Sequence, residues 1–121
     1  MGHETLPVFV RWSKFLNWLL DVTEKFPKRV RFTISSRIDN MALDILELII
    51  EAAYTHRKAD ILKKANLKLE KLRVLCRICH QRHYLSNRSY QYAIKELYES
   101  GRMLGGWIKQ RKKNETQRPL F

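Results

Sequence analysis

Apolar residues recur along the chain in four stretches, at steps that alternate between three and four positions. This spacing places them on one face of an α-helix, which makes a turn in about 3.6 residues. The stripes consist of Val8, Trp12, Phe15, Leu19, Val22 and Phe26; Ile34, Ile38, Met41, Ile45, Leu48 and Ala52; Leu62, Ala65, Leu69, Leu72, Cys76, Cys79 and His83; and Tyr90, Ile94, Leu97, Gly101, Leu104 and Ile108. The pattern predicts helices over about residues 8–26, 34–56, 59–84 and 87–112.

The segments between the predicted helices are short, which favours antiparallel neighbours. Pro27 ends the first helix because it has no amide hydrogen to donate. Thr33 or Ser35 can cap the second helix, and Ser86 can cap the fourth. We therefore predict an all-α fold, an antiparallel up-down-up-down four-helix bundle. The 121 residues form one domain, 1–121, with short flexible ends.

The chain carries a large excess of positive charge. It has 24 Lys and Arg against 12 Asp and Glu, a net charge of +12 and a pI near 10.1. Such an excess indicates a polyanionic partner: RNA, DNA or an anionic membrane. A membrane-surface protein needs an exposed apolar face, and these stripes are better used inside the bundle. The composition therefore favours nucleic acid, bound through its phosphates.

The cations are concentrated in three clusters. The third predicted helix, counted from Lys58, carries half of the net excess, with Arg73 and Arg77 on one edge of its stripe. The other candidate contacts are Lys64, Lys68 and Lys71 on the opposite edge, Lys28, Arg29 and Arg31 in the first connection, and Lys109, Arg111, Lys112 and Lys113 near the end. Any one of these cations, taken alone, is more often a solvated surface charge. Together the cations repel one another, and a bound polyanion would relieve that repulsion. An acidic edge of the second helix, Asp44, Glu47 and Glu51, is expected to face the basic helices.

Four residues of metal-binding type share one helix face: Cys76, Cys79, His80 and His83. A tetrahedral site needs ligands from several directions, which one straight helix does not supply. Cys76, Cys79 and His83 also occupy the apolar stripe, where a thiol packs as a small hydrophobe. We therefore expect core packing, with no metal and no cofactor. A redox role is the weaker alternative, because no strand precedes this Cys-x-x-Cys.

The sequence contains no phosphate-binding loop, nucleophile elbow or zinc-protease motif. We therefore expect a binding protein without catalytic residues, not an enzyme. No cleavable signal opens the chain, no apolar run is long enough to span a membrane, and two cysteines are too few for a secreted disulfide scaffold. The expected compartment is the cytoplasm.

Glycines interrupt the fourth predicted helix, where each costs up to about 1 kcal/mol relative to Ala. Gly101 and Gly105 lie on one face, beside Trp107. Two interpretations stay open: close packing against another backbone of the same chain, or an interface between subunits. Trp107, together with Trp12 and Trp18, is expected to extend past the core.

Part of the sequence resembles a known family. The resemblance rests on the segments Phe26 to Lys28, Arg31 to Thr33, Leu46 to Ile49 and Gly101 to Ile108, and spans about residues 12–112. The most specific piece is Gly-Arg-Met-Leu-Gly-Gly-Trp-Ile at the end of this set. These segments resemble the accessory variability determinant proteins of diversity-generating retroelements, relatives of four-helix-bundle proteins encoded in 23S rRNA intervening sequences.

The resemblance implies a homopentamer without an active site. It implies binding to the retroelement's reverse transcriptase and to template RNA or an RNA–DNA hybrid, in support of mutagenic cDNA synthesis. Arg73 and Arg77 match the arginines of the family's third helix. The cysteines and histidines at positions 76–83 depart from the family pattern. A stand-alone RNA-binding protein of the rRNA-insertion type is the alternative.

Overall fold

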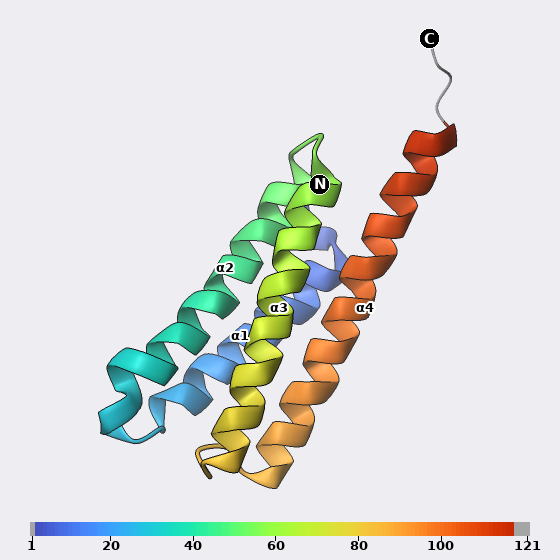
Figure 1. The fold of residues 1–121 in the computed structure, drawn as a ribbon. Coiled ribbons are helices and arrows are strands. Elements are labelled where there is room, and N and C mark those ends of the chain that lie inside the picture. The colour runs from blue at the N-terminus through green and yellow to red at the C-terminus, as the bar shows by residue number, and fades with distance from the viewer. Residues whose placement is uncertain (1, 118–121) are drawn as a thin grey trace.

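The structure, a computed structural model, describes residues 2–117, and the side chains of residues 2–110. A short 3-10 turn, His3–Thr5, precedes four helices: α1 (Pro7–Glu24), α2 (Ser36–Ala53), α3 (Lys58–Gln81) and α4 (Asn87–Gln117). Consecutive helices run antiparallel and pack side by side, as Figure 1 shows. The predicted all-α up-down bundle is confirmed, and α4 continues past its predicted end at residue 112.

The core is built from the predicted helix faces. Its largest fully buried side chains include Trp12, Phe15, Ile45, Leu72 and Leu97. The expectation that Trp12 extends past the core is wrong, because its ring has no exposed surface. Its Nε1 donates a hydrogen bond to the carbonyl oxygen of Ala42, at 2.9 Å. Trp12 therefore satisfies its one polar atom against the backbone of α2. Trp18 and Trp107 are half-buried.

The connection between α1 and α2 is helical throughout most of its length. After α1 ends near Pro27 as predicted, a 3-10 turn, Lys28–Val30, leads into a π-helical turn, Arg31–Ser35. The predicted caps are wrong: Thr33 Oγ1 donates to the carbonyl oxygen of Val30, and Ser35 Oγ is buried without a partner. No side-chain cap is needed, because the backbone before α2 is already helical. The Ser36 amide at the start of α2 donates to the backbone carbonyl oxygens of Arg31 and Thr33.

The turn between α3 and α4 reverses the chain through a left-handed residue. His83 has a φ of 63°, the Tyr84 amide donates to the Cys79 carbonyl at 2.8 Å, and the His83 amide donates to that of His80 at 3.1 Å. These two bonds form a Schellman motif, which usually places glycine at the left-handed position. The predicted core position of His83 is wrong, since the helix ends before it and its side chain is exposed.

The start of α4 has the predicted cap. The Ser89 amide donates to Ser86 Oγ at 3.1 Å. At the other end of the bundle, Lys58 Nζ donates to the carbonyl oxygens of Ala52 and Thr55, at 2.8 and 3.0 Å. Lys58, counted among the basic residues of the third helix, thus closes the end of α2.

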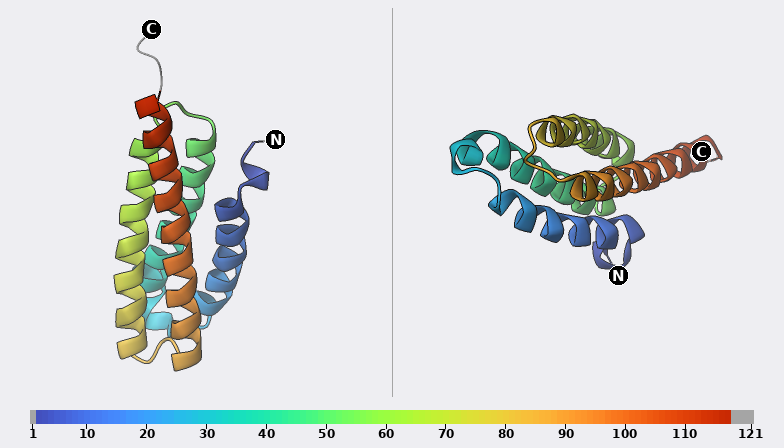
Figure 2. Two further views of the ribbon diagram at one scale, coloured as in Figure 1. Left: turned by 90° about the vertical axis from the view of Figure 1, so that its right-hand side faces the viewer. Right: turned by 90° about the horizontal axis from the view of Figure 1, so that it is seen from below.

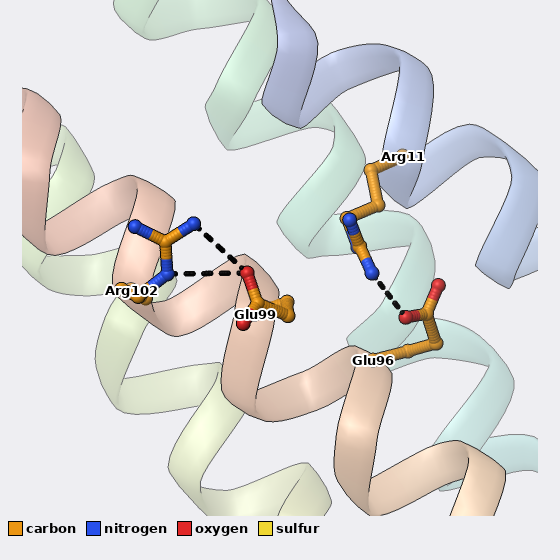
Figure 3. A network of polar contacts seen from close by, with 4 residues as sticks. All are labelled: Arg11, Glu96, Glu99 and Arg102. Atoms are coloured by element: carbon orange, nitrogen blue, oxygen red, sulfur yellow. Dashed lines mark hydrogen bonds and ion pairs between the residues drawn. The ribbon is translucent and has the colours of Figure 1, made fainter.

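The last turns of α4 diverge from the other three helices (Figure 2). Nearer the middle of the bundle, α1 is tied to α4 by an ion pair between Arg11 Nη2 and Glu96 Oε2, 2.7 Å apart (Figure 3). On the outer side of α4, Arg102 Nη2 bonds Glu99 Oε2 at 2.9 Å within the same helix. The first pair joins two helices, and the second joins neighbouring turns of one.

Candidate nucleic-acid interface

The basic residues of α3 lie on two different edges of the helix. Lys68 Nζ approaches Asp44 Oδ2 of α2 at 3.4 Å, so the expected meeting of acidic and basic edges is confirmed at Asp44. Glu47 and Glu51 of that acidic edge are exposed. Arg73 lies on the opposite edge, where it lines a groove shared with Tyr98 and Gly101 of α4. The lysines and the arginines of α3 therefore do not form one patch.

Arg73 is engaged within its own helix. Its Nε donates to Glu70 Oε2 at 3.0 Å, and its Nη2 bonds the other carboxylate oxygen. These hydrogen bonds raise the pKa of Arg73 and lower the pKa of Glu70. The charge of Arg73 is thus partly offset at rest, whereas Arg77 is exposed and pairs with no carboxylate of residues 2–110 at ion-pair distance.

The connection between α1 and α2 presents a group of cations without carboxylate partners. Residues 25–38 contain no acidic residue. All five of their cations are exposed, and none pairs with a carboxylate in the part of the chain whose side chains are described. These cations are Lys25, Lys28, Arg29, Arg31 and Arg37. Together with Arg82 we call them the basic corner.

Tyr84 joins this connection to the end of α3. Its ring packs against Phe26, with ring centroids 5.7 Å apart. The guanidinium carbon of Arg29 lies 5.8 Å from the centroid of the Tyr84 ring, and that of Arg82 lies 5.9 Å from it. One aromatic side chain thus holds two cations from segments far apart in the sequence, at distances where a ring face attracts a cation.

A family model for bAvd-like proteins matches residues 8–111. The chain belongs to the bAvd-like family, named for the bacterial accessory variability determinant. The match begins four residues before the predicted region of resemblance and ends one residue short of it. It includes the basic corner, Arg73 and Arg77, and it ends before Lys112 and Lys113. A search of curated proteins finds no match to this sequence.

The third predicted cluster of this bAvd-like chain begins on the C-terminal part of α4. Lys109 is exposed on the C-terminal part of α4. This end of α4 lies at the end of the bundle opposite the α1–α2 connection (Figure 1). The side chains of Arg111, Lys112 and Lys113 lie outside the described residues. The structure therefore joins the first connection to the C-terminal end of α3, at the end of the bundle opposite the last turns of α4.

The glycine face of α4 is open in the single chain. A Cβ atom added at Gly101 would lie 3.7 Å from Leu69 Cδ2, an ordinary contact, and one added at Gly105 or Gly106 would meet nothing within 4 Å. Close packing against another backbone of the same chain is therefore the wrong explanation for Gly105. Trp107 lies on a different side of α4 from Gly101 and Gly105. There, with Leu6, Pro7, Val8 and Met103 among others, it lines an apolar cavity of about 530 Å³.

The cysteines are core residues, as predicted. Cys76 and Cys79 are completely buried, and burial raises their pKa to about 12 and about 11. Both thiols are therefore protonated near neutral pH. His80 turns away to stack on Tyr90, with ring centroids 4.3 Å apart. Among the described residues, no group of three or more His, Cys, Asp and Glu could hold a metal ion.

Sequence reasoning missed Phe32 and Arg37, which accompany Lys28, Arg29 and Arg31. Phe32 belongs to neither neighbouring stripe, and its side chain is 88% exposed. Its position between cations was the available signal. Of the described helices, none is long and apolar enough to cross a bilayer.

Proposed function

We propose that this chain is a non-catalytic accessory protein of a diversity-generating retroelement. It binds the reverse transcriptase and holds template RNA, or the RNA–DNA hybrid, during mutagenic cDNA synthesis. The observation that carries this proposal is membership of the bAvd-like family over residues 8–111. The net charge of +12 and the unpaired cations of the basic corner supply what binding to phosphates requires.

The nucleic acid is held through its backbone, without reading of base edges. The contacts we assign are those expected from the sequence: Arg73, Arg77, Lys64, Lys68, Lys71, Lys28, Arg29, Arg31, Lys109, Arg111, Lys112 and Lys113. The first connection contributes most at rest, because its cations lack the carboxylate partners that Arg73 and Lys68 have. Lys and Arg side chains that contact phosphates give affinity for nucleic acid but do not distinguish one base sequence from another.

The chain acts as a homopentamer. The open backbone at Gly105 and Gly106 lets a second subunit approach α4 closely. A pentamer presents five copies of each basic surface, so weak contacts add up to useful avidity.

The decisive experiment is co-purification with a reverse transcriptase encoded beside this chain, in the presence of the template RNA. A tagged chain should retain both polymerase and RNA at low salt, and ribonuclease treatment should show which contacts are direct. A charge-reversal control, Lys28→Glu with Arg29→Glu, should lose the RNA and keep its helical circular dichroism. Retention of 23S rRNA and no polymerase would favour the rRNA-insertion type instead. Recovery of neither would reject the proposal.

A further inference from the structure

Phe32 is held away from the core by the π-helical turn Arg31–Ser35. Two neighbours in the chain, Val30 and Ser35, point inward and are 7% and 6% exposed, while the Phe32 side chain is 88% exposed. The surrounding backbone is helical on both sides, so the backbone of Phe32 has a defined position on the surface. Burial of Phe32 therefore contributes little to the fold of the single chain. A π-helical turn frequently marks a functional site, because it changes where side chains point.

Cations surround this ring in the sequence. Arg31 precedes it directly, Lys28 and Arg29 lie one turn before it, and Arg37 follows in the first turns of α2. Arg29 also contacts the ring of Tyr84, which brings Arg82 to the same end of the bundle. The basic corner thus extends from the α1–α2 connection to the end of α3.

We propose that Phe32 is a stacking platform for an unpaired nucleobase, with the cations of the basic corner binding the phosphates on either side. This inference rests on the proposed RNA-binding function and adds the class of strand: a single-stranded segment in preference to a duplex. Bases in a duplex are already stacked on one another, so a surface ring reaches only a base that is unpaired. Every base has a π face, so this contact tolerates any sequence.

Charge complementarity favours a nucleic acid over a protein at this surface. A protein interface needs a contiguous apolar centre with few charges. In residues 25–37, Phe32 is the one large apolar side chain that is exposed, because Phe26 and Val30 are buried and Ile34 is half-buried. An isolated ring among unpaired cations matches the pattern of single-strand binders, in which aromatic side chains stack on bases within a positive groove.

The test compares a fluorescein-labelled single-stranded RNA of about 16 nucleotides with its duplex, by fluorescence anisotropy. Phe32→Leu keeps an apolar side chain of similar size and removes the π face. We expect it to weaken single-strand binding on the order of tenfold, to leave duplex binding within about twofold, and to leave the salt dependence unchanged, because stacking releases no counterions. Phe32→Tyr should retain the affinity of the unsubstituted chain.

The matched control is Tyr54→Leu, which removes another exposed aromatic ring, 66% exposed, at the opposite end of α2. It should leave single-strand binding unchanged. Equal single-strand binding by Phe32→Leu and the unsubstituted chain would overturn the stacking inference and leave the proposed function standing. So would a Phe32→Leu chain that keeps its RNA and loses the polymerase, because the ring would then belong to a protein contact. Failure of the unsubstituted chain to bind either RNA would reject the proposed function itself.

Discussion

Arg11 of α1 and Glu96 of α4 form an ion pair that is 2.7 Å long and unequally buried. The Arg11 side chain is 31% exposed, and the Glu96 side chain is 10% exposed. The Glu96 carboxylate is the more buried partner. Removal of Arg11 would therefore leave a negative charge that water solvates poorly. The pair closes the bundle where α1 and α4 meet (Figure 3).

We expect Arg11→Ala to lower the free energy of unfolding by about 1–3 kcal/mol at neutral pH, because it leaves the Glu96 carboxylate without its partner. Glu96→Gln should cost less, since Arg11, with a side chain that is 31% exposed, is the less buried partner of the pair. Denaturant titration measures both. Arg102→Ala, which breaks an exposed pair within α4, is the control and should leave the transition midpoint unchanged. An equal loss in Arg11→Ala and Glu96→Gln would contradict the role of unequal burial.

The second prediction concerns the left-handed His83. A side chain other than glycine is strained at its φ of 63°. His83→Gly should therefore raise the free energy of unfolding by about 0.5–1 kcal/mol. This is the backbone strain that glycine relieves, reduced by the larger conformational entropy that glycine gives the unfolded chain. His83→Ala, which also removes the imidazole but keeps Cβ, should give no such gain. A gain of equal size in both variants would mean that the imidazole, and not the backbone, is unfavourable here.

The architecture could be predicted because one kind of signal determines it. Four stripes with helical spacing, separated by short links, allow few arrangements other than an antiparallel bundle. The same signal placed Cys76 and Cys79 in the core correctly. It failed for His83, because a stripe does not reveal where a helix stops when the left-handed residue is not glycine.

The candidate site was harder to predict because it depends on contacts between elements. Arg29 and Arg82 meet at the ring of Tyr84 only because of where α1 and α3 end. The spacing of apolar residues does not determine where a helix ends. The outward position of Phe32 likewise depends on a π-helical turn, which has no helical signal in the sequence, because apolar and polar residues simply alternate from Val30 to Ile34. The positions of the basic clusters could be predicted, as could the meeting of α3 with Asp44 of the acidic edge. The pairing of Arg73 with Glu70 was not predicted.

The third prediction is a loss of stability at alkaline pH caused by the buried thiols. Burial raises the pKa of Cys76 from 9.0 to about 12 and that of Cys79 to about 11. Above pH 9 the unfolded chain loses these protons while the folded chain keeps them. Stability is therefore complete below pH 9 and falls as the pH rises toward 12, by up to about 1.4 kcal/mol per pH unit for Cys76. The variant Cys76→Ala with Cys79→Ala should be less stable at pH 7 and lose less on going to high pH.

The same variant tests for zinc. We expect a chelator to leave the melting temperature of the unsubstituted chain unchanged, and the cost of the double substitution to be a few kcal/mol of lost packing. Stoichiometric zinc in the purified protein, with a melting temperature that falls on chelation, would contradict the packing role.

The fourth prediction concerns assembly through α4. Gly105→Ala fits the single chain, because its Cβ meets nothing within 4 Å, and it should stabilise the helix by up to about 1 kcal/mol. Gly105→Leu should keep the helical circular dichroism and dissociate the pentamer in light scattering behind a sizing column. Asn17→Leu adds the same side chain on the exposed face of α1 and should leave assembly intact. A stable monomer of the unsubstituted chain at micromolar concentration would contradict the pentamer.

The last prediction separates the two basic surfaces by their salt dependence. Affinity for single-stranded RNA should fall steeply with salt, with a log–log slope of about −0.7 per neutralised phosphate. Replacing Lys28, Arg29 and Arg31 by Ala should flatten this slope by about 2, and replacing Arg73 and Arg77 should flatten it less, because Arg73 already bonds Glu70. In each variant, the loss of affinity should be similar for RNAs of unrelated sequence.

Glu70→Gln gives the complementary test, because it removes the carboxylate that competes with phosphate for Arg73. It should tighten RNA binding in the unsubstituted background and have no effect once Arg73 is Ala. A loss of binding confined to one RNA sequence would indicate base readout, and an unchanged slope in both basic variants would place the phosphate contacts elsewhere on the chain.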